Sequence, residues 1–121
     1  MNGFRAAAMF AMVVPVMVGA QVTVAKPGSE INQLASQVVG TWTYEGAAKT
    51  NPYGPAGKIT GTDVYELGPG GFSVSHRWDE QDPLGHVTGL EVFAWDASKK
   101  TLAGTYYTSV GEVGNGPITV A

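Results

Sequence analysis

Hydrophobic and polar residues alternate along most of the chain after residue 36, in short runs separated by turn-forming residues. A period of two is typical of strands that bury one face, and clusters of Gly, Pro, Asn and Asp between the runs predict turns. Because no helical pattern separates the runs, we expect each strand to pair with the next in an antiparallel meander. The predicted strands span residues 40–49, 57–67, 72–80, 87–96, 101–109 and 117–121.

A short amphipathic segment precedes the first predicted strand. Ile31, Leu34 and Val38 are spaced so that they share one face of a helix. The sequence therefore predicts an all-β domain of residues 36–121, preceded by a linker and short helix in residues 21–35.

Residues 1–20 have the pattern of a secretory signal peptide. Arg5 precedes an apolar run, and the segment ends with small residues up to Ala20, as a signal peptidase requires. A retained membrane anchor is the alternative, but the run contains Pro15 and is shorter than the ~20 residues that cross a bilayer. We expect a periplasmic or secreted protein, which must fold without disulfides because the chain has no Cys.

The charge of the chain limits its partners. Loss of Arg5 with residues 1–20 changes the net charge from −3 to −4, since Lys plus Arg falls from 7 to 6 against 10 acidic residues. A mildly acidic domain without a basic stripe is not expected to bind nucleic acid or, after cleavage, a membrane.

Strand alternation predicts which side chains face the interior of the sheet. Small-molecule sites are largely apolar with a few convergent polar groups, and the inward face combines both kinds. We interpret seven of its residues as candidate ligand-binding residues: Tyr44, Asp63, Tyr65, His76, Trp78, Glu91 and Tyr106.

The predicted turns also set a register. A loop of residues 68–71 sets Tyr65 opposite Val74 and Asp63 opposite His76, while loops of 81–86 and 97–100 bring Glu91 between His76 and Tyr106. The result is a polar row of Asp63, His76, Glu91 and Tyr106 across four strands. The row is either a hydrogen-bonded structural network or the polar end of a ligand site. Residues 87–96 are apolar on both faces, so Leu90, Val92 and Ala94 are an alternative inward set.

The sequence gives little indication of a catalytic or metal-binding site. Ser73 and Ser75 alternate to the face opposite His76, which excludes a Ser-His-Asp arrangement. The acidic run 79–82 is interpreted as a solvated loop, and no metal or other cofactor is predicted, because one metal-ligating set matches no compact zinc motif. That set is His76, Asp79, Glu80, Asp82 and His86.

The end of the chain leaves two alternatives open. Asn115-Gly116 is a strong hairpin signal, but the strand that should follow it ends at Ala121. Closing a barrel around a ligand takes about eight strands, more than the chain predicts. Either the chain is a fragment, which we favour, or the sheet stays open and associates with another copy through its edges.

Several short motifs resemble bacterial proteins of domain of unknown function 1579. They are Gly40-Thr41-Trp42-Thr43-Tyr44-Glu45-Gly46, Gly61-Thr62-Asp63-Val64-Tyr65-Glu66, Pro69-Gly70-Gly71-Phe72, His76-Arg77, Ala94-Trp95-Asp96-Ala97-Ser98-Lys99-Lys100 and Gly111-Glu112. The resemblance covers residues 36–121 and implies an incomplete calycin-like or lipocalin-like barrel without an agreed activity. In such barrels a Gly-x-Trp triplet begins the first strand, so Trp42 is expected to close the floor against the short helix. A more distant similarity to haem-binding nitrobindin-like barrels supplies no iron ligand, because theirs lies in a region absent here.

The sequence predicts an exported protein that binds a small apolar or amphipathic molecule inside a β-barrel. The first alternative is a structural or assembly module without a ligand. The second is a haem-binding or lyase-type or isomerase-type barrel that acts through His76.

Overall fold

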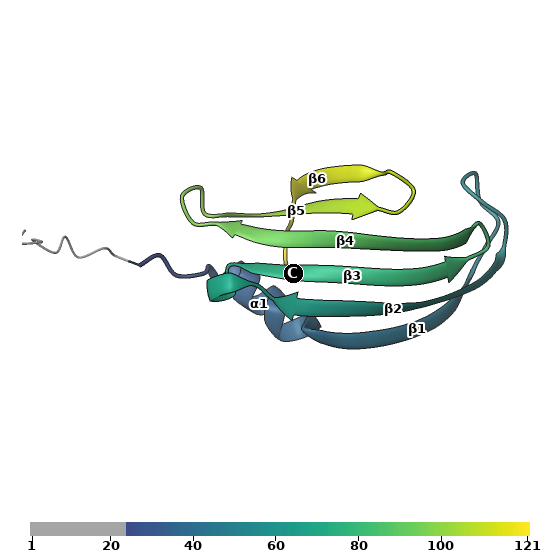
Figure 1. Cartoon of the computed structure of the whole chain (residues 1–121). Helices are drawn as coiled ribbons and strands as arrows, with labels where there is room; N and C mark the ends of the chain where they lie inside the picture. The colour runs from purple at the N-terminus through teal and green to yellow at the C-terminus, as the bar shows by residue number, and fades with distance from the viewer. Residues whose placement is uncertain (1–23) are drawn as a thin grey trace, which may run out of the picture.

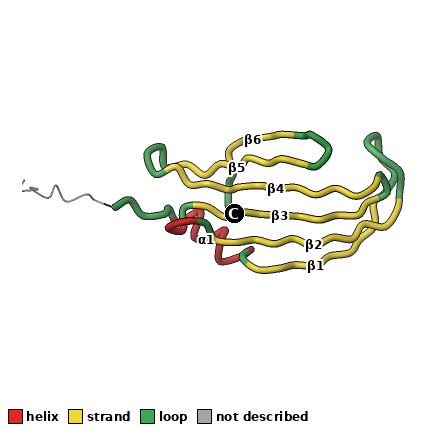
Figure 2. Tube along the Cα trace, in the orientation of Figure 1, coloured by secondary structure: helices red, strands yellow, loops and turns green. Residues whose placement is uncertain are grey.

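A computed structural model describes residues 24–121, so the predicted signal peptide of residues 1–20 lies outside the described residues. One helix precedes six strands, and a short 3-10 turn separates the second strand from the third (Figures 1 and 2). The elements are α1 (Ser29–Val38), β1 (Gly40–Ala48), β2 (Gly57–Leu67), η1 (Pro69–Gly71), β3 (Ser73–Asp82), β4 (Gly85–Asp96), β5 (Thr101–Thr108) and β6 (Val113–Pro117).

The six strands form a single antiparallel sheet in the order of the sequence, β1 to β6. In the described residues β1 pairs with β2 alone and β6 with β5 alone, so the sheet is not closed. The predicted meander, an incomplete barrel with one short helix, is confirmed. Successive side chains of each strand point to opposite faces of the sheet, and α1 covers one of these faces.

The hydrophobic core lies where α1 packs against one face of the sheet. Ile31 of α1, Val74 of β3 and Leu102 of β5 are buried, and α1 lies at the end of the sheet where β2 joins β3 (Figure 1). We call the face that α1 covers the concave face. Phe93 and Trp95 pack against this core, so β4 directs its odd-numbered residues to the concave face, and the alternative set of Leu90, Val92 and Ala94 lies on the other face.

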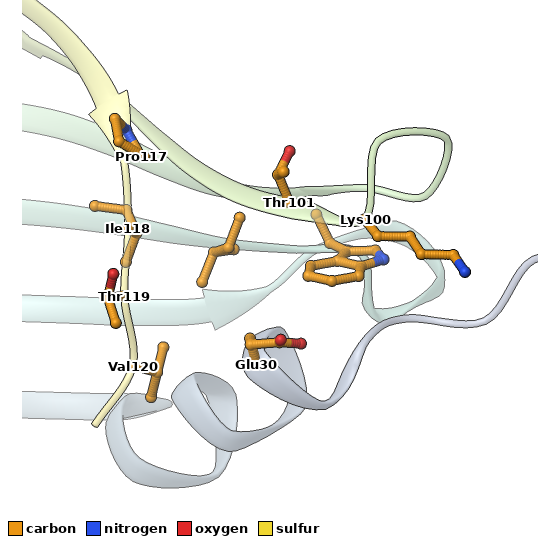
Figure 3. A pocket seen from close by; sticks show the side chains of 9 residues that line it. Glu30, Lys100, Thr101, Pro117, Ile118, Thr119 and Val120 are labelled. Atoms are coloured by element: carbon orange, nitrogen blue, oxygen red, sulfur yellow. The ribbon is translucent and has the colours of Figure 1, made fainter.

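The C-terminal segment, residues 118–121, crosses from β6 toward α1 (Figure 3). The backbone N–H of Ile118 donates to the carbonyl of Leu102 over 2.9 Å, and the side chain of Gln33 donates to the carbonyl of Ala121 over 3.1 Å. This segment therefore links the β6 edge of the sheet to the helix.

The predicted last strand, 117–121, and its turn at 114–116 are wrong. Residues 113–117 form β6, and the chain reverses at residues 109–112, where Gly111 has a φ of 85° and its N–H donates to the Thr108 carbonyl over 3.1 Å. Tyr106 pairs with Gly114, and a side chain at position 114 would collide with the Tyr106 ring. Gly114 thus allows the Tyr106 ring to pack on β6, and the Asn115-Gly116 pair that predicted a turn lies within this strand.

The predicted burial of Trp42 is also wrong. Its side chain is 50% exposed, and its indole N–H donates to the carbonyl of Val38 at the end of α1 over 2.7 Å. β1 is an edge strand, so Trp42 has a neighbouring strand on one side, where it pairs with Asp63. Trp42 therefore makes a hydrogen bond with the end of the helix, and the side chain buried against the sheet is that of Ile31.

Candidate functional site

The register between β2 and β3 places Tyr65 opposite His76 and Asp63 opposite Trp78. The predicted pairs, Tyr65 with Val74 and Asp63 with His76, are wrong by two residues. The turn is longer than predicted because it includes Phe72 and closes where the Gly68 N–H donates to the Ser73 carbonyl over 2.7 Å. A shift of two residues keeps every side chain on its predicted face.

His76 lies on the concave face between two carboxylates. Its Nε2 is 3.1 Å from Asp63 Oδ1, and its Nδ1 is 3.5 Å from Glu91 Oε2. The side chains of His76, Asp63 and Glu91 are 13%, 23% and 22% exposed. The predicted pairs of Glu91 with His76 and with Tyr106 are both confirmed. The diagonal contact across β2 and β3 brings Asp63 to His76 although the two are not directly opposite.

The two imidazole nitrogens have different environments. Nε2 makes a hydrogen bond with Asp63, whereas Nδ1 is buried and makes no hydrogen bond. In a neutral imidazole that donates from Nε2, Nδ1 carries a lone pair and is an acceptor. Glu91 Oε2 lies 3.5 Å from this nitrogen, a contact that is an ion pair only with a protonated imidazole.

Two aromatic rings fix the orientation of the imidazole. The Tyr65 ring stacks on His76 with centroids 4.1 Å apart and planes 3° apart, and the Trp78 ring lies 5.2 Å from His76 at 34°. Burial, followed by the charges of Asp63 and Glu91, raises the pKa of the Tyr65 phenol above its usual value. The phenol therefore stays protonated next to the carboxylates.

Glu80 was missed as a site residue. The Tyr44 hydroxyl donates to its carboxylate over 2.6 Å, and burial together with this hydrogen bond raises the pKa of Tyr44 above its usual value. Residues 79–82 were interpreted as a solvated loop, but they continue β3. Extending the alternation of Val74, His76 and Trp78 by one step would have placed Glu80 on the concave face.

Three aromatic rings on this face each lie over a glycine of the neighbouring strand. A side chain at the glycine would collide with the ring in all three pairs, which are Tyr44 with Gly61, Trp78 with Gly89, and Tyr106 with Gly114. The rings therefore lie along the sheet, against the backbone of the neighbouring strand.

A hollow of about 250 Å³ lies beside Glu91 and Tyr106, between β4, β5 and β6. A second hollow, of about 350 Å³, lies between α1, the β4–β5 turn and the C-terminal segment (Figure 3). Its walls include Glu30 and Lys100, which are exposed and opposite in charge. None of the seven predicted ligand-binding residues lines this second hollow, whereas Glu91 and Tyr106 line the first. Because Glu91 also contacts His76, the first hollow and the adjoining polar row form the candidate site.

The serines and the second histidine of this region lie away from the His76 site. Ser75 pairs with Val92 on the face opposite His76. His86 bonds Asp79 on that same opposite face over 2.7 Å. Within residues 24–121, no cluster of three or more His, Cys, Asp or Glu is placed to hold a metal ion. In the same part of the chain, no helix has the length and hydrophobicity that a membrane span requires.

The open antiparallel sheet, its single helix and the polar row across its concave face define a small, mostly β domain, consistent with an incomplete barrel. A family model described as "Protein of unknown function (DUF1579)" matches residues 26–114, and the chain belongs to this family. The matched region includes Asp63, His76 and Glu91. Searches of curated proteins and of solved structures gave no significant match.

Proposed function

We propose that this chain binds a small amphipathic molecule on the concave face of its sheet, after export directed by residues 1–20. The apolar body of the molecule lies against the aromatic rings, and its polar end is directed toward Asp63, His76 and Glu91. The proposal places the protein in the periplasm or outside the cell.

The environment of His76 is the observation that carries this proposal. Its side chain is 13% exposed, between two carboxylates, and its buried Nδ1 makes no hydrogen bond. Buried polar groups are generally hydrogen-bonded, and an exception calls for an explanation. A purely structural network would be expected to satisfy both nitrogens. A row that leaves one unsatisfied beside a hollow is better explained as part of a binding site.

Two neighbouring tyrosines of β5 provide a matched test of the binding face. Tyr106 lines the hollow on the concave face, whereas Tyr107 pairs with Leu90 on the opposite face and is 51% exposed. The neutral apolar dye N-phenyl-1-naphthylamine serves as the probe, with its fluorescence followed during titration of the purified protein. An aromatic contact contributes about 0.5–1.5 kcal/mol, so Tyr106→Ala should weaken dye binding by about twofold to tenfold.

Tyr107→Ala removes the same side chain from the other face and should leave dye binding unchanged. Absence of saturable binding to the unmodified protein, or an equal loss in the two variants, would overturn the proposed binding face.

A second candidate function is assembly through the sheet edges. In the described residues β1 has nine residues and a partner strand on one side, and an unpaired strand is a template for pairing with another chain. The haem-binding and the lyase or isomerase alternatives stay predictions.

A further inference from the structure

Charge is distributed unequally between the two faces of the sheet. The concave face carries the carboxylates of Asp63, Glu80 and Glu91, which lie on the same side of the sheet as His76. The basic residues within strands, Lys58 and Arg77, lie on the other face. That face also carries the carboxylates of Glu45, Glu66 and Asp79. The remaining Lys residues of the described part precede α1 or lie in turns: Lys26, Lys49, Lys99 and Lys100.

Because the Lys and Arg residues of the strands lie on the other face, the concave face is the more negative of the two. Three carboxylates outweigh His76 even when its imidazole is protonated. Charges that are largely removed from water interact more strongly than exposed ones, and Asp63 and Glu91 are each less than a quarter exposed. An anionic ligand group would be repelled here, and a cationic group would be attracted.

The three carboxylates differ in the hydrogen-bond donors that they already have within the protein. The hydroxyl of Tyr44 donates to Glu80, and His76 Nε2 donates to Asp63. Glu91 Oε2 instead faces His76 Nδ1, which makes no hydrogen bond. Glu91 also lines the hollow of about 250 Å³, so it is the carboxylate most in need of a donor and the one beside free space.

The aromatic residues point to the same class of ligand independently of the carboxylates. Tyr106 lines the hollow beside Glu91, and its ring lies along the sheet over Gly114. The face of an aromatic ring attracts a cation and also packs against apolar groups. A carboxylate next to such a ring suits an ammonium group attached to an apolar body.

We propose, on the basis of the function proposed above, that the ligand is an organic cation, a protonated amine with an apolar body. Its ammonium group binds the Glu91 carboxylate, and its body packs on Tyr106 and along the aromatic residues of the concave face. The raised pKa of the Tyr65 phenol, caused partly by Asp63 and Glu91, agrees with a negative potential on this face.

Three probes with the same alkyl chain test the sign of charge: decylammonium, decanol and decanoate, each titrated into the purified protein by calorimetry below its micelle concentration. We expect decylammonium to bind about tenfold more tightly than decanol, decanoate to bind most weakly, and added salt to reduce the advantage of decylammonium. Decanol or decanoate binding as tightly as decylammonium would overturn the cation proposal while leaving the binding face intact. If none of the three probes and no dye binds, the proposed function fails as well.

Substitution of Glu91 tests the anchor. Glu91→Gln should lower decylammonium affinity by about tenfold and leave decanol affinity unchanged. Glu66→Gln removes the same charge from the opposite face of β2, where Glu66 pairs with Ser75, and should leave both affinities unchanged. Equal effects of the two substitutions would overturn the role of Glu91. The comparison of the three probes on the unmodified protein does not depend on whether Glu91→Gln folds.

Discussion

The ring of Trp78 lies over Gly89 in the neighbouring strand, at a distance that leaves no room for a methyl group. Glycine within a strand costs roughly 0.5–1 kcal/mol relative to Ala. Contact between the ring and the backbone offsets this cost. In this position the Trp78 ring also packs against the imidazole of His76. A glycine thereby determines the position of a site residue on the next strand.

Adding a methyl group at this position should destabilise the protein. Gly89→Ala forces the Trp78 ring away from the sheet, and overpacking of this kind costs about 1–3 kcal/mol. The free energy of unfolding in urea gives the measurement, and tryptophan emission should shift as the ring moves.

Gly116→Ala is the matched control, because it adds a methyl group to a strand glycine that has open space around it. Its stability should be unchanged or slightly higher. Equal destabilisation by the two substitutions would contradict the steric explanation.

At the scale of residues, alternation correctly predicted that Asp63, His76 and Glu91 lie on one side of the sheet. It did not predict which residues of β2 and β3 lie directly opposite each other. The error at β2–β3 came from the turn, because η1 (Pro69–Gly71) and its flanking residues Gly68 and Phe72 form a connection whose length the clustered glycines do not specify. Glu80 was missed because its acidic neighbours suggested solvent, although charged residues can alternate faces like any others.

At the scale of elements, α1 contributes one fully buried side chain, Ile31, to the hydrophobic core. Ile31 is fully buried against Val74 and Leu102, while Trp42, in the edge strand that follows the helix, is half exposed. The amphipathic spacing predicted the helix. It could not predict which residue covers the end of the sheet, because burial at an edge strand depends on what lies beside that strand.

Truncation of Ile31 should therefore cost more than truncation of the larger Trp42. Ile31→Ala removes a buried side chain from a packed core, a change that costs about 2–5 kcal/mol, whereas Trp42→Ala removes a half-exposed ring and one hydrogen bond, worth about 0.5–1.5 kcal/mol. Thermal and urea unfolding of the two variants give the comparison. A larger loss for Trp42→Ala would show that Trp42, not Ile31, closes the floor.

At the scale of the whole molecule, the two described edges of the sheet differ. β6 has five residues and ends at Pro117, which cannot donate a backbone hydrogen bond, whereas β1 has nine residues and no proline. Short strands and prolines protect an edge from pairing with another chain. The β1 edge is thus the more open of the two.

We expect the purified protein to self-associate through β1. Thr43→Lys places a charge on this exposed edge and should reduce association, since lysine on an edge strand opposes pairing. Sedimentation velocity over a range of protein concentrations measures the effect.

Thr105→Lys adds the same charge to β5, which has a neighbouring strand on each side, and should not change association. A protein that stays monomeric at high concentration, or an equal response to both substitutions, would exclude the β1 edge as the contact.

The contact of the C-terminal segment with α1 has a consequence for the order of folding. Each strand pairs with the next in sequence, so the sheet can grow by hairpins that form in ~1–10 μs each. The bond from Gln33 to Ala121 joins residues 88 apart, and closing so long a loop is entropically unfavourable until the sheet has brought its ends together. The helix and the C-terminal segment are therefore expected to meet late in folding, so weakening their contact should speed unfolding more than it slows folding.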